Sequence, residues 1–129
     1  MKLTYETCHS SLRATAVIAL NQRVNNSTLA EVCKEYFSND VMLMRDTLGV
    51  TITPVGLVGR LDGLNIEYRD SIMIEVDYIG GKDIKEWKHS FALIFKSMMQ
   101  ELATESGTVR FSDGEILKFY CPFAMNIQH

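Results

Sequence analysis

Apolar residues recur at helical spacing in three parts of the chain. The first set stands four residues apart and predicts a helix over about residues 10–24: Leu12, Ala16, Leu20 and Val24. A second helix is predicted over residues 28–48, where Thr28 and Glu31 form a capping box. Ser38-Asn39-Asp40 either continues this helix or divides it, and the pattern leaves both open. A third helix is predicted between Asp83 and Gly107, where Asp83 and Glu86 form a second capping-box-like start. Its apolar face is regular: Ile84, Trp87, Phe91, Ile94, Phe95, Met98 and Leu102.

Between the second and third helices the pattern alternates with a period of two, which predicts strands. Asp62-Gly63 is a two-residue hairpin signal, and a second turn is expected around Asp70. These turns give a meander of three strands whose inward face holds Leu57, Gly59, Leu61, Leu64, Ile66, Tyr68, Ile72, Ile74 and Val76. The outward face then holds Val58, Arg60, Asn65, Glu67, Arg69, Met73, Glu75, Asp77 and Ile79. A closing hairpin is predicted around Ser112-Asp113-Gly114, with one face formed by Val109, Phe111, Leu117, Phe119 and Cys121.

These elements predict a single α+β domain over residues 1–129 with the order α-α-β-β-β-α-β-β. The expected architecture is a mostly antiparallel sheet of about five strands with helices packed on it. Residues 122–129 follow the last strand as an apolar C-terminal tail, which we interpret as a segment that forms an interface. With 129 residues, 47% of them hydrophobic and 22% charged, the composition is that of one globular domain.

Charge and hydropathy exclude several classes of protein. The formal net charge of −3 argues against a nucleic-acid partner, and the apolar runs are too short to span a membrane. The polar N-terminus argues against secretion. The odd number of widely spaced cysteines (Cys8, Cys33 and Cys121) is not a disulfide framework. We therefore expect a cytoplasmic protein, or a virion component if the protein is phage-encoded.

Candidate chemistry is sparse along the chain. Gly80-Gly81-Lys82-Asp83 lies where a phosphate loop would lie, but Asp83 stands in place of the required Ser or Thr and would repel a phosphate. Glu67, Glu75 and Asp77 share the outward sheet face, which we interpret as solvated rather than catalytic. Cys8-His9 has no third orienting group, and metal-binding spacings of Cys and His are absent from the sequence. We therefore assign no catalytic, cofactor or metal residues, and expect neither a cofactor nor a small-molecule ligand.

Two surface features remain. One is a basic strip before and along the third helix, formed by Lys82, Lys85, Lys88 and Lys96, which we interpret as an ordinary solvated face. The other is a surplus of apolar residues that the predicted core does not use, in a chain with 7 methionines. These candidate interface residues are Met42, Leu43, Met73, Ile79, Phe123, Met125 and Ile127. They predict a protein partner or self-association as a homo-oligomer.

These observations favour a non-enzymatic protein that acts through protein–protein contact, as an oligomer. The order of the predicted elements over residues 10–121 resembles that of phage tail-terminator and neck-completion proteins, which form rings that cap a tube. One alternative is a small inhibitor or immunity-type protein that masks a target. Another is a small enzyme or ligand-binding domain with a pocket between helices and sheet, lined by Tyr36, Tyr68, Tyr78 and Trp87.

Overall fold

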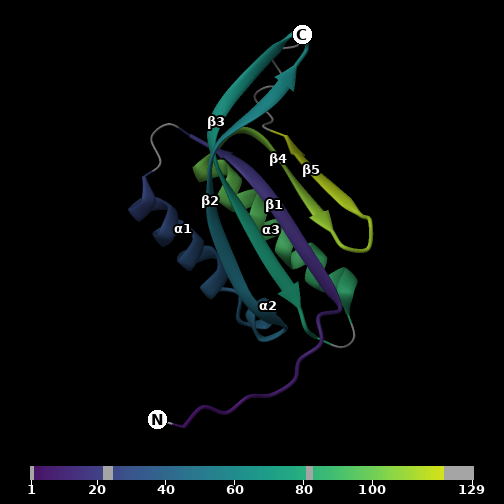
Figure 1. Cartoon of the computed structure of the whole chain (residues 1–129). Coiled ribbons are helices and arrows are strands. Elements are labelled where there is room, and N and C mark those ends of the chain that lie inside the picture. The colour runs from purple at the N-terminus through teal and green to yellow at the C-terminus, as the bar shows by residue number, and fades with distance from the viewer. Residues whose placement is uncertain (1, 22–24, 81–82, 121–129) are drawn as a thin grey trace.

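The computed structural model describes residues 2–21, 25–80 and 83–120 (Figure 1). Five strands and three helices follow one another in the order β1 (Leu12–Leu20), α1 (Asn26–Ser38), α2 (Val41–Arg45), β2 (Thr47–Asp62), β3 (Asn65–Tyr78), α3 (Ile84–Leu102), β4 (Ala103–Phe111) and β5 (Ile116–Tyr120). The predicted class is confirmed: a single α+β domain with an antiparallel sheet of five strands and helices packed on it.

The strands lie in the order β2-β3-β1-β4-β5, and each neighbouring pair is antiparallel. With one helical crossover between β1 and β2 and another between β3 and β4, this is a ferredoxin-like split β-α-β fold extended by β5 at one edge. The helices α1 and α3 share one side of the sheet, where Phe37 of α1 packs against Phe91 of α3 with ring centroids 6.1 Å apart (Figure 1). The hydrophobic core lies between these helices and the sheet.

The first predicted helix is wrong, because Leu12–Leu20 forms the central strand β1. Residues four apart share one face of a strand as well as one face of a helix, so the spacing of the apolar residues did not distinguish the two. Leu12, Ala14, Ala16 and Ile18 are buried, while Arg13 and Val17 between them are exposed. Pairing with β3 on one side and β4 on the other satisfies the backbone of this segment along most of its length.

The three-strand meander is also wrong, because β2 and β3 form one long hairpin. Its turn lies one residue later than predicted: Asp62 pairs with Asn65, and Leu61 pairs with Ile66 instead of Leu64. Gly63 supplies the positive φ of +61° that the turn requires. The expected turn at Asp70 does not form, because this residue pairs with Leu57 in a continuous strand. Leu64 lies in the turn, and the other predicted inward positions do lie on one face, but those before Ser71 are exposed.

Some helix ends differ from the prediction, the start of α3 agrees with it, and Asp40 decides an alternative that the sequence pattern left open. Asn25 caps α1 by accepting a 2.8 Å hydrogen bond from the Thr28 backbone, so the cap lies three residues before the predicted capping box. Asp40 divides the second helix by capping α2, through a 2.9 Å bond from the Leu43 amide. Asp83 caps α3 as expected. That helix ends at Leu102 rather than near Gly107, which belongs to β4.

The closing hairpin is confirmed. Gly114 has a φ of +98°, and Arg110 of β4 pairs with Ile116 of β5. On the predicted face, Val109 and Phe111 are buried, and Leu117 and Phe119 pack against the core. The last member of that face, Cys121, lies outside the described residues, as does the predicted tail over residues 122–129.

The β2–β3 hairpin is longer than the strands beside it. Pairing between β1 and β3 ends at Ala19 and Ser71, while β2 and β3 remain paired up to Asp62 and Asn65. Residues 57–70, called the arm below, therefore project past the helices as a two-stranded ribbon (Figure 1). The other end of β3, at Tyr78, reaches α2 and the start of α3.

Candidate functional site

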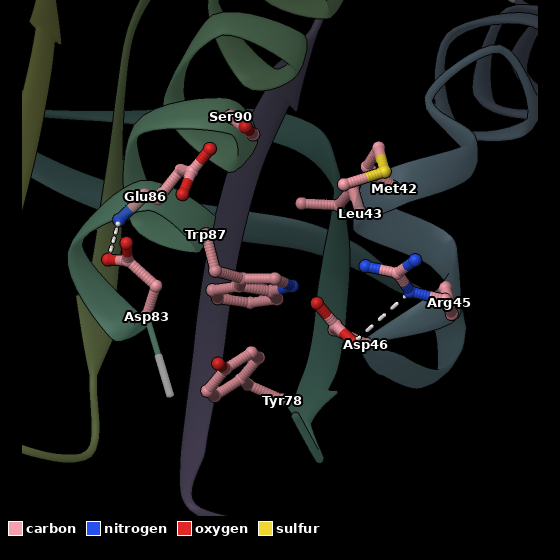
Figure 2. Close-up of a pocket in the computed structure, with 9 residues that line it drawn as sticks. All are labelled: Met42, Leu43, Arg45, Asp46, Tyr78, Asp83, Glu86, Trp87 and Ser90. Atoms are coloured by element: carbon pink, nitrogen blue, oxygen red, sulfur yellow. Dashed lines mark hydrogen bonds and ion pairs between the residues drawn. The ribbon is translucent and has the colours of Figure 1, made fainter. Parts of the chain in front are cut away.

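A cavity of about 430 Å³ opens where α2, the end of β3 and the first turns of α3 meet (Figure 2). This volume lies within the range of about 300–1,000 Å³ that is usual for small-molecule sites. Its lining residues come from three short segments of the chain: Met42, Leu43, Arg45, Asp46, Tyr78, Asp83, Glu86, Trp87 and Ser90. We call this the α2–α3 cavity.

Two aromatic rings form the inner wall of the α2–α3 cavity. The Tyr78 and Trp87 rings have centroids 5.2 Å apart, and both residues are almost fully buried. The indole Nε1 of Trp87 donates a 3.1 Å hydrogen bond to Thr47 Oγ1, and that hydroxyl donates to the Leu43 carbonyl at 2.7 Å. Behind it, Trp87 stacks on Phe91 with an interplanar angle of 20°. These contacts fix the aromatic wall before any ligand binds.

Three carboxylates surround this wall. Asp46 ends α2, Asp83 caps α3, and Glu86 lies on the first turn of α3. Figure 2 shows Asp46 on one side of Trp87 and Asp83 with Glu86 on the other. Arg45 brings one guanidinium, whose Nε lies 3.7 Å from Asp46 Oδ1. Three acids against one base leave a formal charge of −2 on the lining, which favours a positively charged ligand.

The chain at Ile79 and Gly80 passes close beside Asp46. The Ile79 amide donates a 2.8 Å hydrogen bond to the Asp46 carbonyl, which fixes the end of α2 beside the end of β3. A Cβ on Gly80 would lie 2.8 Å from both Asp46 Cγ and Tyr78 Cε1, closer than real side chains approach. The absence of a side chain at Gly80 therefore gives the chain room to pass beside two residues of the cavity.

A second cavity, of about 380 Å³, lies at the base of the arm. It is lined by Leu20, Asn21, Leu29, Pro54, Gly56, Leu57, Tyr68, Arg69, Asp70, Ser71 and Ile72. Arg69 and Asp70 balance one another in charge here, and the Ser71 hydroxyl donates to the Arg69 carbonyl at 3.0 Å. The lining therefore lacks the net negative charge of the α2–α3 cavity.

The predicted interface residues are dispersed over the molecule. Met42 is exposed at the mouth of the α2–α3 cavity, and Met73 and Ile79 are half-buried. The prediction of Leu43 as an interface residue is wrong, because Leu43 is 2% exposed and packs in this chain's own core. Phe123, Met125 and Ile127 lie outside the described residues. The interface role of the exposed residues stays a prediction.

The predicted basic strip is not a uniform row of free cations. Lys85 and Lys96 are exposed on α3, and Lys82 lies outside the described residues. Lys88 instead holds α3 to the closing hairpin, with Nζ 2.5 Å from Asp113 and 3.1 Å from Glu115. It also lies 4.8 Å from the centroid of the Phe111 ring. Lys88 is therefore a structural ion-pair residue.

The remaining candidates divide between cavities and structural contacts. Tyr78 and Trp87 line the α2–α3 cavity, as the pocket alternative expected, and Tyr68 lines the second cavity. Tyr36 lines neither and hydrogen-bonds Glu101.

Burial raises the pKa of the Cys33 thiol to about 11, which makes it unsuited to nucleophilic chemistry at neutral pH. Among the described residues, no group of three His, Cys, Asp or Glu side chains is placed to hold a metal ion.

Sequence reasoning missed the acidic character of this cavity. Asp83 and Glu86 were recognised as a helix-capping pair, and Asp46 was not singled out. The cavity joins residues 42–46, 78 and 83–90, which no motif spacing connects. The visible signal was indirect: Gly80 between a predicted strand and a predicted helix, a place where ligands often bind.

No protein-family model matches the chain, and a search of curated proteins also finds no match. Among solved structures, the fold is similar to a phage SAM lyase in complex with S-methyl-5'-thioadenosine, with a TM-score of 0.67 and 11% identity. That alignment covers 93% of this chain and 97% of the other. A phage SAM lyase in the apo state aligns with a TM-score of 0.61 and 12% identity, over 94% of this chain and 98% of that one. At these identities the comparisons establish the fold.

These comparisons correct the predicted function. A non-enzymatic assembly protein, such as a virion tail-terminator or neck-completion component, is the wrong interpretation, because the matching fold is that of an enzyme with a bound small molecule. The alternative of a small enzyme or ligand-binding domain with a pocket between helices and sheet agrees better with the comparisons. Among the described residues, no helix is long and apolar enough to cross a bilayer.

Proposed function

We propose that this chain binds a small organic cation in the α2–α3 cavity and acts as a lyase on S-adenosylmethionine (SAM). The observation that carries the proposal is the cavity lining, in which three carboxylates surround a fixed pair of aromatic rings. A sulfonium is a permanent cation, and carboxylates and aromatic rings are the protein groups that attract such cations. The fold shared with a phage SAM lyase supports SAM as the cation-bearing substrate.

The chemistry of a SAM lyase relates the charge of the cavity to the reaction. When the bond between the sulfonium and the amino-acid carbon breaks, its electron pair stays on sulfur and produces the neutral thioether S-methyl-5'-thioadenosine. A carboxylate oxygen of the same amino-acid group forms the new bond to that carbon and closes a lactone, so neither water nor a cofactor is consumed. Asp46 and Glu86 would hold the cationic substrate and lose that attraction once the thioether forms. The cavity would therefore bind substrate more tightly than product.

A turnover assay on matched variants tests this proposal. Native protein incubated with SAM should form S-methyl-5'-thioadenosine, measured by chromatography. The double variant Asp46→Asn/Glu86→Gln should lower kcat/KM by at least about 100-fold, because each of the two charge-assisted contacts contributes about 1.5–3 kcal/mol and every 1.4 kcal/mol is about tenfold. The control Glu31→Gln/Glu35→Gln removes the same charge from the exposed side of α1 and should leave the rate unchanged.

Two outcomes would contradict the proposal. One is that native protein produces S-methyl-5'-thioadenosine no faster than SAM decays alone. The other is that the cavity and control variants lose activity equally, which would place the reaction elsewhere. Asp83 is left unchanged in these variants because it also caps α3, and its loss would weaken the helix.

We also propose that the protein is cytoplasmic, as the sequence predicts. This setting is supported by Cys8 and Cys33, which are both free thiols in the structure.

A further inference from the structure

We propose that the arm is a self-association surface, and that its apolar face packs against the same face of a second copy of this chain. The proposal rests on the arrangement of side chains along residues 57–70 and does not involve the α2–α3 cavity. It can hold or fail independently of the proposed enzymatic function.

The arm is amphipathic. Directly opposed residues of an antiparallel pair share a face, so Leu57, Gly59 and Leu61 lie on the same face as Asp70, Tyr68 and Ile66. We call this the apolar face, although Asp70 lies at its base. Val58, Arg60, Asn65, Glu67 and Arg69 lie on the opposite, polar face. A sheet with this alternation normally buries its apolar side.

That apolar side is not buried in the single chain. Leu57 is 68% exposed, Leu61 70%, Ile66 56% and Tyr68 63%, and Leu64 at the turn is fully exposed. The Tyr68 ring lies against Gly59, where a Cβ would come within 2.7 Å of Tyr68 Cε1. The ring therefore covers the glycine backbone and adds to the apolar surface. A two-stranded ribbon on its own is marginally stable in water, so the arm needs a partner surface.

The apolar face continues the helix-covered face of the sheet. Tyr68 and Ile66 have the same side-chain direction along β3 as Ile72 and Ile74, which pack under the helices. The core face thus runs past the ends of the helices onto the arm, where no described element covers it (Figure 1). The partner must supply the apolar layer that the helices supply elsewhere.

The exposed area matches the requirement of a stable dimer. The five exposed side chains present on the order of 100 Å² each, or about 500 Å² for each copy. A standard interface buries about 800 Å² on each partner, of which about 60% is apolar. A second copy offers this area with a complementary face, because two identical apolar faces pack across a two-fold axis.

The charge and width of the arm favour a second copy over other occupants. The polar face carries both signs, with Arg69 Nη2 3.9 Å from Glu67 Oε2, so it does not select a strongly charged partner. Phe123, Met125 and Ile127 of this chain's own tail are two residues apart in sequence. An extended segment with that spacing presents a single row of side chains, whereas the apolar face is two strands wide.

Light scattering coupled to size-exclusion chromatography tests the proposal on the full chain. Native protein should have at least twice the mass of one chain over a range of concentrations. The triple variant Leu57→Thr/Leu61→Thr/Ile66→Thr keeps strand-forming residues but removes the apolar face, and should have the mass of one chain. The matched control Val58→Thr/Asn65→Thr changes the polar face and should associate as the native protein does.

A second variant guards against misfolding of the first. Ile66→Lys places like charges opposite one another across the proposed contact, and should dissociate the protein while its circular dichroism stays native. The proposal is overturned if native protein has the mass of one chain at every concentration. It is also overturned if the apolar-face variants associate like the native protein, or if association disappears only when residues 122–129 are deleted.

Discussion

Arg13 of β1 reaches across to β3 on the side of the sheet opposite the helices. Its Nε lies 3.0 Å from Asp77 Oδ1 and its Nη2 3.1 Å from Asp77 Oδ2, and Glu75 Oε2 lies 3.4 Å from Nη1. Ser10 also donates to Asp77, at 3.0 Å. The hydrogen bonds from Arg13, with smaller help from Ser10 and from the charge of Arg13, hold the pKa of Asp77 below its ordinary value despite partial burial. The carboxylates of this face are therefore engaged in structural pairing.

The lowered pKa of Asp77 predicts an acid-sensitive contribution to stability. Because the folded-state pKa lies below the unfolded value of about 3.9, this contribution is present above that pH and is lost as the pH falls through the folded pKa. Asp77→Asn should therefore have a lower free energy of unfolding than the native protein at pH 7. The difference between the two proteins should become smaller under more acidic conditions. Urea unfolding at neutral and acidic pH measures this. The same difference in free energy of unfolding at both pH values would contradict the lowered pKa of Asp77.

At the scale of single elements, strand β1 shows where sequence periodicity stops being informative. The four-residue spacing of Leu12, Ala16 and Leu20 fits either periodicity, and the intervening Ala14 and Ile18 complete a strand face. The turn expected at Asp70 failed for a different reason. Its turn-forming tendency is local, whereas cross-strand pairing with Leu57 depends on a segment more than ten residues away. Long-range pairing decided both elements.

The contact between α3 and β4 depends on a glycine. A Cβ on Gly107 would lie 2.7 Å from Met99 Sδ and 3.4 Å from Phe95 Cε1, so the strand passes close beneath the helix. Gly107→Val should lower the free energy of unfolding by about 1–3 kcal/mol through overpacking. The control Gly49→Val has open space, with nothing within 4 Å of its Cβ, and should change stability little. Equal denaturation midpoints for the two variants would show that the end of the Met99 side chain moves aside at little cost.

At the scale of the whole molecule, strand β3 connects two features that lie at its opposite ends. Its Tyr78 end forms the aromatic wall of the α2–α3 cavity, and its Asn65 end forms the arm. The sheet register that buries Ile72, Ile74 and Val76 also sets the faces of both ends. A single long hairpin thus positions the proposed binding site at one end and the proposed association surface at the other.

The fold class and the amphipathic face of α3 could be predicted because they depend on local periodicity and on the balance of apolar residues. The apolar face of the arm could be predicted as well, but its exposure could not, since burial depends on where the helices end. The α2–α3 cavity could not be assembled from sequence. Asp46 and Glu86 line the same cavity only because α2, the end of β3 and the first turns of α3 meet there.

The most direct test of the proposed function is to compare the affinities of two ligands that differ in one methyl group and the charge it confers, measured within milliseconds of mixing so that turnover does not consume SAM. SAM carries a sulfonium, and S-adenosylhomocysteine has the same nucleoside and amino-acid groups around a neutral thioether. The acidic lining of the α2–α3 cavity predicts that native protein binds SAM at least tenfold more tightly, and that Asp46→Asn/Glu86→Gln removes this preference. Equal affinity of the native protein for both ligands, or binding of neither, would contradict the account.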